Sequence, residues 1–209
     1  MKTLYIDTSS DYLYGGIVID NLIQTEIKEE LGKNLSKAAL PKIIKLFDEA
    51  AIKPQNLDKI IVVIGPGSFT GIRIGVTIAK TIAWSLNIPI VPISGLVAMA
   101  LSNPNTNTFA LPLIDARRGY VYGAFYDKNM NKVVEDSHIK LEELINKVKK
   151  YQPITVITNH NIETSYETVR YNPDILKIVN HFQDKEGINP HLVNPIYLKK
   201  TEAEEKANL

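Results

Sequence analysis

The glycine-rich stretch at residues 65–75 has the residue types and the spacing best suited to chemistry. It reads Gly-Pro-Gly-Ser-Phe-Thr-Gly-Ile-Arg-Ile-Gly, directly after an apolar β-branched run and directly before a helical pattern. Glycines at such a strand-to-helix junction allow another group to approach the backbone closely. The hydroxyls of Ser68 and Thr70 and the cation of Arg73 lie near the positive end of the helix dipole, where an anion is stabilised. The stretch therefore predicts either a phosphate cradle or a surface on which two helices pack closely.

A second polar cluster, Asp7-Thr8-Ser9, follows the first predicted strand. A carboxylate and two hydroxyls at the tip of a buried strand can hold a metal ion or a phosphate. The same residue types also favour an Asx or Ser/Thr turn that leads into a hairpin, and we favour this interpretation from these residues alone. If the two clusters act together, the phosphate site comprises Asp7, Thr8, Ser9, Gly65, Gly67, Ser68, Thr70 and Arg73.

The glycine-rich stretch matches neither common nucleotide-binding fingerprint. A Walker loop has Lys-Ser/Thr after its last glycine, whereas Ile72 and Arg73 follow Gly71 here. The Rossmann pattern Gly-x-Gly-x-x-Gly fails because Thr70 occupies the position of the third glycine. Gly71 and Gly75 share one face of a helix, so a neighbouring backbone can approach them, within the chain or across an interface. The spacing alone leaves phosphate binding and close packing equally open.

The remaining residue types predict no catalytic residue and no metal ligand. The chain has no cysteine, which excludes disulfides, thiolate metal sites and cysteine nucleophiles. The histidines are too far apart for a metal pair on one helix, and no His-x-x-x-His occurs. Ser68 has no local base or orienting group that would make it a nucleophile. The histidines in question are His138, His160, His181 and His191.

Composition is typical of a globular protein without a strong net charge. The 209 residues include 24 Lys and Arg against 23 Asp and Glu, so no net field draws the protein onto nucleic acid. The basic clusters at residues 117–118 and 147–150 are interpreted as solvated faces. The N-terminus lacks the apolar segment of a signal peptide, and no apolar run approaches the length of a membrane span. We therefore expect a cytoplasmic protein without membrane contact.

The hydrophobic pattern predicts the strands and helices that would position the two clusters. Alternating or fully apolar runs bounded by turn formers indicate strands, and apolar residues at helical spacing indicate helices. The predicted strands are residues 3–6, 12–19, 22–28, 60–64, 88–93, 109–114, 120–126, 132–134 and 154–158. The predicted helices are residues 36–50, 72–86, 95–101 and 141–151.

The order of these elements predicts two α/β domains. Residues 1–101 give the order β-β-β-α-β-α-β-α, and the polar, turn-forming residues 102–108 make the best linker. Residues 109–209 begin the same order again without sequence repetition. We therefore expect a duplicated architecture whose second copy is degenerate.

Four motifs resemble those of the TsaB (YeaZ) family, which is related to the TsaD/glycoprotease (peptidase M22-like) family. They are Leu-Tyr-Ile-Asp-Thr-Ser at residues 4–9, the glycine-rich stretch, Asp-Ala-Arg-Arg at 115–118 followed by Val121-Tyr122, and Pro-Ile-Tyr-Leu at 195–198. The resemblance is good over the first domain and the start of the second, and loose beyond. It implies an α/β actin-like ATPase (ASKHA) fold with two domains, each a mixed β-sheet flanked by helices.

The resemblance also implies a function in tRNA modification. TsaB proteins are non-catalytic partners of TsaD, which transfers threonylcarbamoyl to the adenosine beside the anticodon in tRNAs that read codons beginning with A. TsaD binds its metal through His-x-x-x-His, which this sequence lacks. The implied assembly has TsaD bound to the N-terminal helices, TsaE as a further member, and tRNA bound only through the complex. The implied interface consists of Leu40, Ile43, Ile44, Phe47, Gly71, Ile72, Gly75, Val76 and Ala79.

Two departures from the family pattern favour a scaffold over an enzyme. Residues 34–36 are Asn-Leu-Ser where relatives often carry His-Ser, and residues 158–161 are Thr-Asn-His-Asn in place of a Gly-Asp-Gly-like turn. The phosphate site is then vestigial, with at most weak ATP or ADP binding and no certain cofactor. The alternative is an ATP-binding enzyme of the actin-like fold that uses Asp7 for a metal and residues 65–71 for phosphate. A peptidase has little support.

The apolar helix faces also imply self-association. An unpaired apolar face of this size is seldom left wet, so the chain alone is expected to form a homodimer. Direct contact with tRNA stays open for Arg117, Arg118, Lys199 and Lys200.

Overall fold

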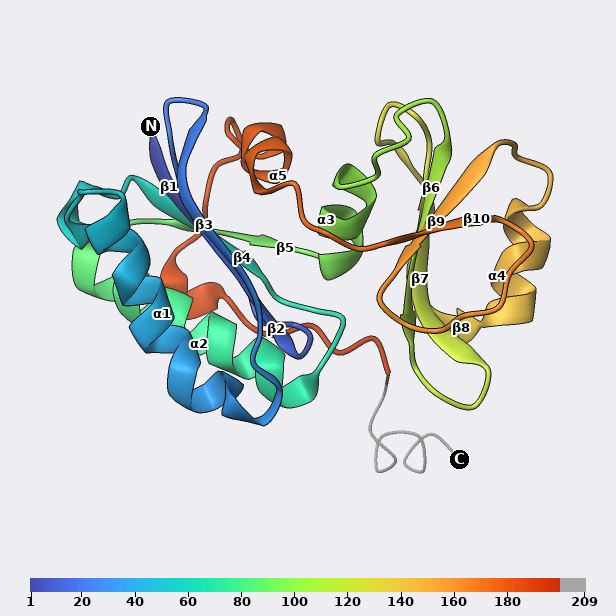
Figure 1. Cartoon of the computed structure of the whole chain (residues 1–209), viewed down its shortest axis with the longest axis horizontal. Coiled ribbons are helices and arrows are strands. Elements are labelled where there is room, and N and C mark those ends of the chain that lie inside the picture. Colours follow the sequence, from blue (N-terminus) through green and yellow to red (C-terminus); the bar gives the residue numbers. More distant parts are fainter. Residues whose placement is uncertain (200–209) are drawn as a thin grey trace. The chain divides into compact units, whose positions relative to one another are not determined.

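The computed structural model describes residues 1–199, which divide into two compact units (Figure 1). Unit 1 comprises Met1–Ser102 and Pro173–Pro195. Unit 2 comprises Asn103–Asn172 and the segment that begins at Ile196. Within the described residues, no helix is long and apolar enough to cross a membrane.

Unit 1 is built on a five-stranded mixed sheet with the strand order β3-β2-β1-β4-β5. The first three strands form an antiparallel meander, and β4 and β5 run parallel to β1 on its other side. The apolar runs of β1 and β4 are buried nearly throughout, as expected for central strands covered on both faces. The bounds are β1 Lys2–Asp7, β2 Tyr12–Ile19, β3 Leu22–Glu30, β4 Lys59–Val63 and β5 Ile90–Ile93.

Helices cover both faces of this sheet. Successive residues of a strand point to opposite faces, and two adjacent glycines of β2 mark what lies on each. Gly15 faces Leu46 of one helix, whereas Gly16 faces Ile175 of another. The helix that contains Leu46 is α1 (Leu35–Glu49). It packs beside the long helix α2 (Phe69–Leu86), and Figure 1 shows both on the same side of the sheet. The helices of unit 1 are α1 Leu35–Glu49, α2 Phe69–Leu86, α3 Gly95–Leu101 and α5 Ile175–His181.

The segment Pro173–Pro195 is tied to unit 1 by polar contacts that the sequence did not predict. The ammonium of Lys59 in β4 donates to the carbonyl oxygens of Phe182 at 2.9 Å and Gln183 at 2.6 Å. Burial lowers the pKa of Lys59 below its ordinary value. The backbones of Ile90 and Ile188 exchange hydrogen bonds of 3.0 and 2.7 Å. The sequence predicted that residues 109–209 form the second domain. The structure differs from this prediction, because residues 173–195 pack on the first unit.

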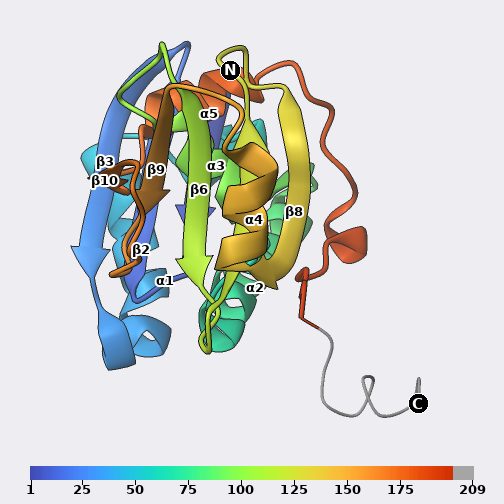
Figure 2. The same cartoon turned by 90° about the vertical axis from the view of Figure 1, so that its right-hand side faces the viewer.

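Unit 2 repeats the plan of unit 1. Its sheet has the order β10-β9-β6-β7-β8, again an antiparallel meander with two parallel strands on the far side of the first strand. Figure 2 shows α4 in front of this sheet, where it packs on β7 and β8. The duplicated order of elements is thereby confirmed. The bounds are β6 Phe109–Asp115, β7 Tyr120–Tyr126, β8 Lys132–Lys140, α4 Leu141–Val148, β9 Ile154–Thr158 and β10 Glu167–Arg170.

Candidate functional site

The glycine-rich stretch packs directly against the end of β1 in unit 1. A Cβ atom placed on Gly71 would overlap the carbonyl oxygen of Thr8, and one on Gly75 would overlap the hydroxyl of the same threonine. Gly67 is equally close to the backbone of Ser9 and has a φ of +153°. These glycines therefore allow α2 to approach β1 more closely than side chains would permit.

Hydrogen bonds inside the chain occupy the polar groups at this junction. The hydroxyl of Thr8 donates to the carbonyl oxygen of Gly71 at 2.7 Å, and the amide of Ser68 donates to the carbonyl oxygen of Ser9 at 2.7 Å. The hydroxyl of Ser68 caps α2 by accepting from the amide of Gly71. A carboxylate oxygen of Asp7 accepts from the amide of Ser9 at 2.8 Å, which is an Asx turn. The two predicted clusters thus form a clasp that joins β1 to α2.

The structure separates the predicted phosphate residues into two groups. The buried Asp7 and Thr8 lie with the glycines and Ser68 in the clasp, and the carbonyl oxygen of Gly65 accepts from the first amide of α3 at 2.8 Å. Thr70 and Arg73 are exposed on the first turns of α2, and the Arg73 guanidinium lies over the ring of Phe69 at 4.7 Å. Among the described residues, no cluster of His, Asp or Glu has the size needed to hold a metal ion.

The clasp makes Thr8 a stabilising residue. Thr8→Val keeps the shape of the side chain but removes the donor to the buried Gly71 carbonyl oxygen. Loss of one buried hydrogen-bond partner should lower the free energy of unfolding by about 1–2 kcal/mol, as measured by urea denaturation. Thr81→Val on the exposed face of α2 is the control, and it should change the free energy of unfolding by only a few tenths of a kcal/mol. Equal stability of the Thr8 variant and the wild type would contradict the role assigned to the clasp.

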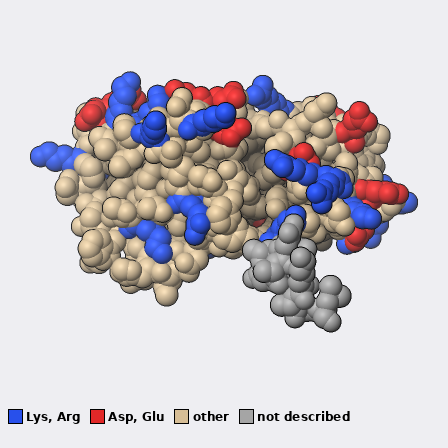
Figure 3. All heavy atoms as spheres, turned by 90° about the horizontal axis from the view of Figure 1, so that it is seen from below, with Lys and Arg blue, Asp and Glu red and all other residues tan. Residues whose placement is uncertain are grey.

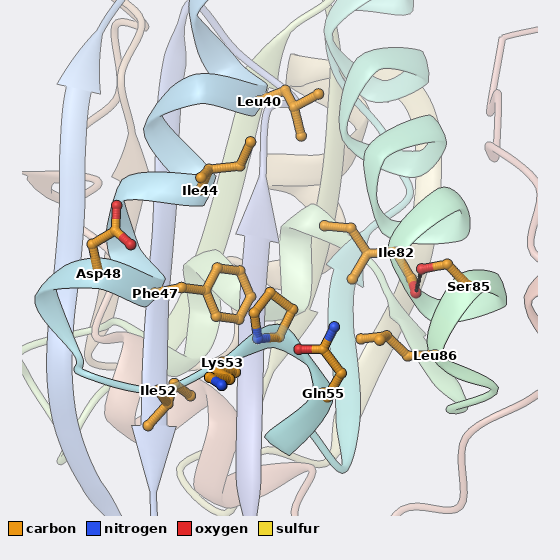
Figure 4. A pocket seen from close by; sticks show the side chains of 11 residues that line it. Leu40, Ile44, Phe47, Asp48, Ile52, Lys53, Gln55, Ile82, Ser85 and Leu86 are labelled. Carbon is orange, nitrogen blue, oxygen red and sulfur yellow. Dashed lines mark hydrogen bonds between the residues drawn. The ribbon is translucent and has the colours of Figure 1, made fainter.

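A groove of about 400 Å³ opens between α1 and α2 on the outer surface of unit 1. Figure 4 shows Leu40 and Ile44 of α1 on one side of it, Ile82 and Leu86 of α2 on the other, and Phe47 between the two helices. Leu40 is 45% exposed and Ile44 is 53% exposed, which is high for large aliphatic side chains. Polar side chains stand at its edges, so the groove has an apolar centre with a polar rim. The other lining residues are Asp48, Ile52, Lys53, Pro54, Gln55 and Ser85.

In the free chain, the structure buries every residue of the predicted interface except Leu40 and Ile44. These residues form the core between the helices and the sheet, and Gly71 and Gly75 contact Thr8 of their own chain. The centre of the apolar stripe on each helix faces the sheet, so only residues at the edge of the stripe remain exposed. The buried residues are Ile43, Phe47, Gly71, Ile72, Gly75, Val76 and Ala79. The predicted interface did not include the groove residues Ile82 and Leu86, although both belong to the apolar pattern of α2.

Comparison with known proteins places this architecture in a family. The family described as TsaD, tRNA N6-adenosine threonylcarbamoyltransferase, matches residues 18–174. The tRNA threonylcarbamoyladenosine biosynthesis protein TsaB of Bacillus subtilis is 33% identical, over 99% of this chain and 97% of its own. TsaB of Escherichia coli is 30% identical, over 64% of this chain and 58% of its own.

A solved structure agrees with the fold. YeaZ from Pseudomonas aeruginosa superposes with a TM-score of 0.83 at 21% identity, covering 94% of this chain and 99% of that one. This likeness and the duplicated sheet order confirm the predicted α/β architecture of two mixed sheets flanked by helices. The chain therefore belongs to the TsaB (YeaZ) proteins of the TsaD-related family.

Proposed function

We propose that this chain serves tRNA threonylcarbamoyladenosine biosynthesis as a non-catalytic subunit that binds and activates a TsaD-type partner. The observation that carries the proposal is the apolar groove between α1 and α2. The names of the relatives supply the pathway, and the TsaD family match supplies the class of partner. TsaE is proposed as a further member of the assembly, and tRNA as a ligand of the assembly rather than of this chain alone.

The groove has the chemistry of a helix-binding surface. Aliphatic side chains line both sides of the groove, among them Ile44 of α1 and Ile82 of α2. The apolar ridge of a partner helix can pack between them. Complete burial of a Leu or Ile side chain contributes about 1.5–3 kcal/mol, so a few such side chains support a stable complex. Asp48, Lys53 and Gln55 at the edge can fix the register of the partner through polar contacts.

The surrounding surface supports the same proposal. Figure 3 views the molecule from below, the side on which α1 and α2 lie in Figure 1. The middle of the part of this surface that belongs to unit 1 is mostly uncharged, with a few Lys and Arg side chains, and charges of both signs lie along its upper edge in the view. An interface that excludes water is favoured on such a surface, because few charges need to be desolvated.

The non-catalytic part of the proposal rests on the clasp. Thr8 and Ser68, the hydroxyl residues best placed for phosphate chemistry, bond to the backbone of Gly71 instead. The space beside Gly67 and Gly71, where a phosphate would have to bind, is filled by the backbone of Thr8 and Ser9. The groups of this junction thus hold the fold of unit 1 together.

Mixing this chain with the TsaD-type protein of the same organism tests the proposal. We expect one stable heterodimer in size-exclusion chromatography with light scattering, and a heat of binding in calorimetry. Without the partner, we propose that the same face pairs with a second copy, which sedimentation equilibrium would detect as a homodimer. If the two proteins elute separately at micromolar concentration, the partner function is wrong.

A further inference from the structure

The turn between β6 and β7 in unit 2 holds two arginines in an unusual backbone conformation. Arg117 has a φ of +67° and Arg118 a φ of +54°. Residues with a Cβ atom are strained in this left-handed region, which Gly and Asn normally occupy. Both arginines are exposed, so packing of their side chains does not require the strain. Residues in such conformations cluster at functional sites, which makes these two exposed side chains candidates for one.

The turn is rigid because it is bonded from several sides. A carboxylate oxygen of Asp115 accepts from the amide of Arg117 at 2.8 Å, and the amide of Leu141 in α4 donates to the carbonyl oxygen of Gly119 at 2.9 Å. Tyr120, the next residue, stacks on His138 with ring centroids 4.8 Å apart. Tyr122 contacts the same imidazole at 5.4 Å. The two guanidinium groups are therefore presented from a fixed support, which favours the binding of a rigid partner.

The charge around the turn is available for a partner. Lys140 is exposed and lies opposite Tyr120 in the register of β7 and β8, so a third cation adjoins the turn. Within residues 1–199, neither guanidinium makes an ion pair. Two nearby carboxylates are engaged elsewhere, Asp115 with the turn itself and Glu143 with Lys147 at 2.8 Å. The turn lies beyond the lower end of β6 in Figure 2, and Figure 3 shows Lys and Arg gathered on this side of unit 2.

We propose that Arg117 and Arg118 bind the phosphate backbone of the tRNA that the assembly modifies. This inference rests on the proposed function, which makes tRNA the substrate of the assembly. A guanidinium group binds a phosphate through two parallel hydrogen bonds, and two adjacent groups can hold successive phosphates of one strand. A polyanion of regular charge suits a pair of fixed cations better than an isolated carboxylate on a protein surface does. The turn then orients the tRNA on the complex without reading its sequence.

Titration of a fluorescein-labelled transcript into the preassembled complex tests this inference. The transcript is a tRNA that reads codons beginning with A, and the complex contains this chain and the TsaD-type partner. Arg117→Gln/Arg118→Gln should raise the Kd for tRNA about tenfold or more and reduce the slope of log K against log salt by about two. The variant should bind the TsaD-type partner with unchanged affinity.

Two matched variants control the experiment. Lys149→Gln/Lys150→Gln removes the same charge at the other end of α4 and should leave the Kd for tRNA within about threefold. Arg117→Lys/Arg118→Lys keeps both charges and should retain the salt slope with a smaller loss of affinity, because lysine lacks the planar fork. Circular dichroism and thermal melting establish that each variant is folded.

Each other outcome overturns the inference. Unchanged tRNA affinity and salt slope in the arginine variant would place the turn away from the RNA. An equal loss in the lysine control would indicate general charge alone, and a loss of partner binding would make the turn a protein contact. If the wild-type complex itself fails to form, the proposed function fails separately. The same titration on the isolated chain then decides the inference, and absence of tRNA binding there overturns it.

Discussion

Replacing Leu40 and Ile44 together by glutamate should lower the affinity for the TsaD-type partner by about a hundredfold or more. Two carboxylates would have to be desolvated at the centre of the groove, which costs more than the apolar contacts return. Both side chains are roughly half exposed in the free chain, so the fold of unit 1 should tolerate the change. Isothermal titration calorimetry with the purified partner measures the effect. The same variant should be monomeric when it is alone.

A matched control separates the groove from general surface charge. Leu22, the first residue of β3, is 64% exposed and is not among the residues that line the groove. Leu22→Glu should therefore bind the partner with wild-type affinity and keep the self-association of the parent chain. If the Leu40/Ile44 variant binds within about threefold of the wild type, the groove is not the interface.

Gly71→Ala should lower the free energy of unfolding by about 2–4 kcal/mol. The added methyl group would overlap the carbonyl oxygen of Thr8, a backbone atom that cannot move without shifting the end of β1. Alanine is otherwise the better helix former by about 1 kcal/mol, so the sign of the effect is diagnostic. Urea denaturation followed by circular dichroism gives the value.

The control for this substitution lies on the exposed face of the same helix. Thr77→Ala should leave stability unchanged or raise it by a few tenths of a kcal/mol, because alanine has the higher helix propensity. A Gly71→Ala variant as stable as the wild type would show that α2 does not depend on close approach to β1. The glycine would then be free for a contact between chains.

Most of the fold could be predicted from the hydrophobic pattern. The bounds of β2, β7, β9 and α3 agree with the sequence-based expectation, because turn formers or a helix cap mark their ends. Two elements were missed, β10 and α5. The four residues of β10 are mostly exposed and polar, and the strand exists because it pairs with β9. Helix α5 has seven residues and is fixed by tertiary contacts with the sheet.

The candidate sites were harder to predict, for a physical reason. Helical periodicity predicts which stripe of each helix faces the sheet. The groove lies at the edge of these stripes, between Leu40 of α1 and Leu86 of α2, which are far apart in sequence. The glycine spacing predicted close approach of another backbone, but between two helices, whereas Thr8 at the end of β1 is the residue that lies against Gly71 and Gly75. The turn formers Asp115 and Gly119 indicate a turn at this place, but nothing in the sequence indicated the left-handed conformation of Arg117 and Arg118, because arginine has no preference for it.

Reconstituted threonylcarbamoyl transfer to tRNA tests the central claim most directly. The TsaD-type partner and TsaE are assayed alone, with wild-type chain, and with the Leu40→Glu/Ile44→Glu variant. We expect transfer only with the wild-type chain, and a rate with the variant close to that without any chain. Equal rates with and without the wild-type chain would contradict its role as an activating subunit.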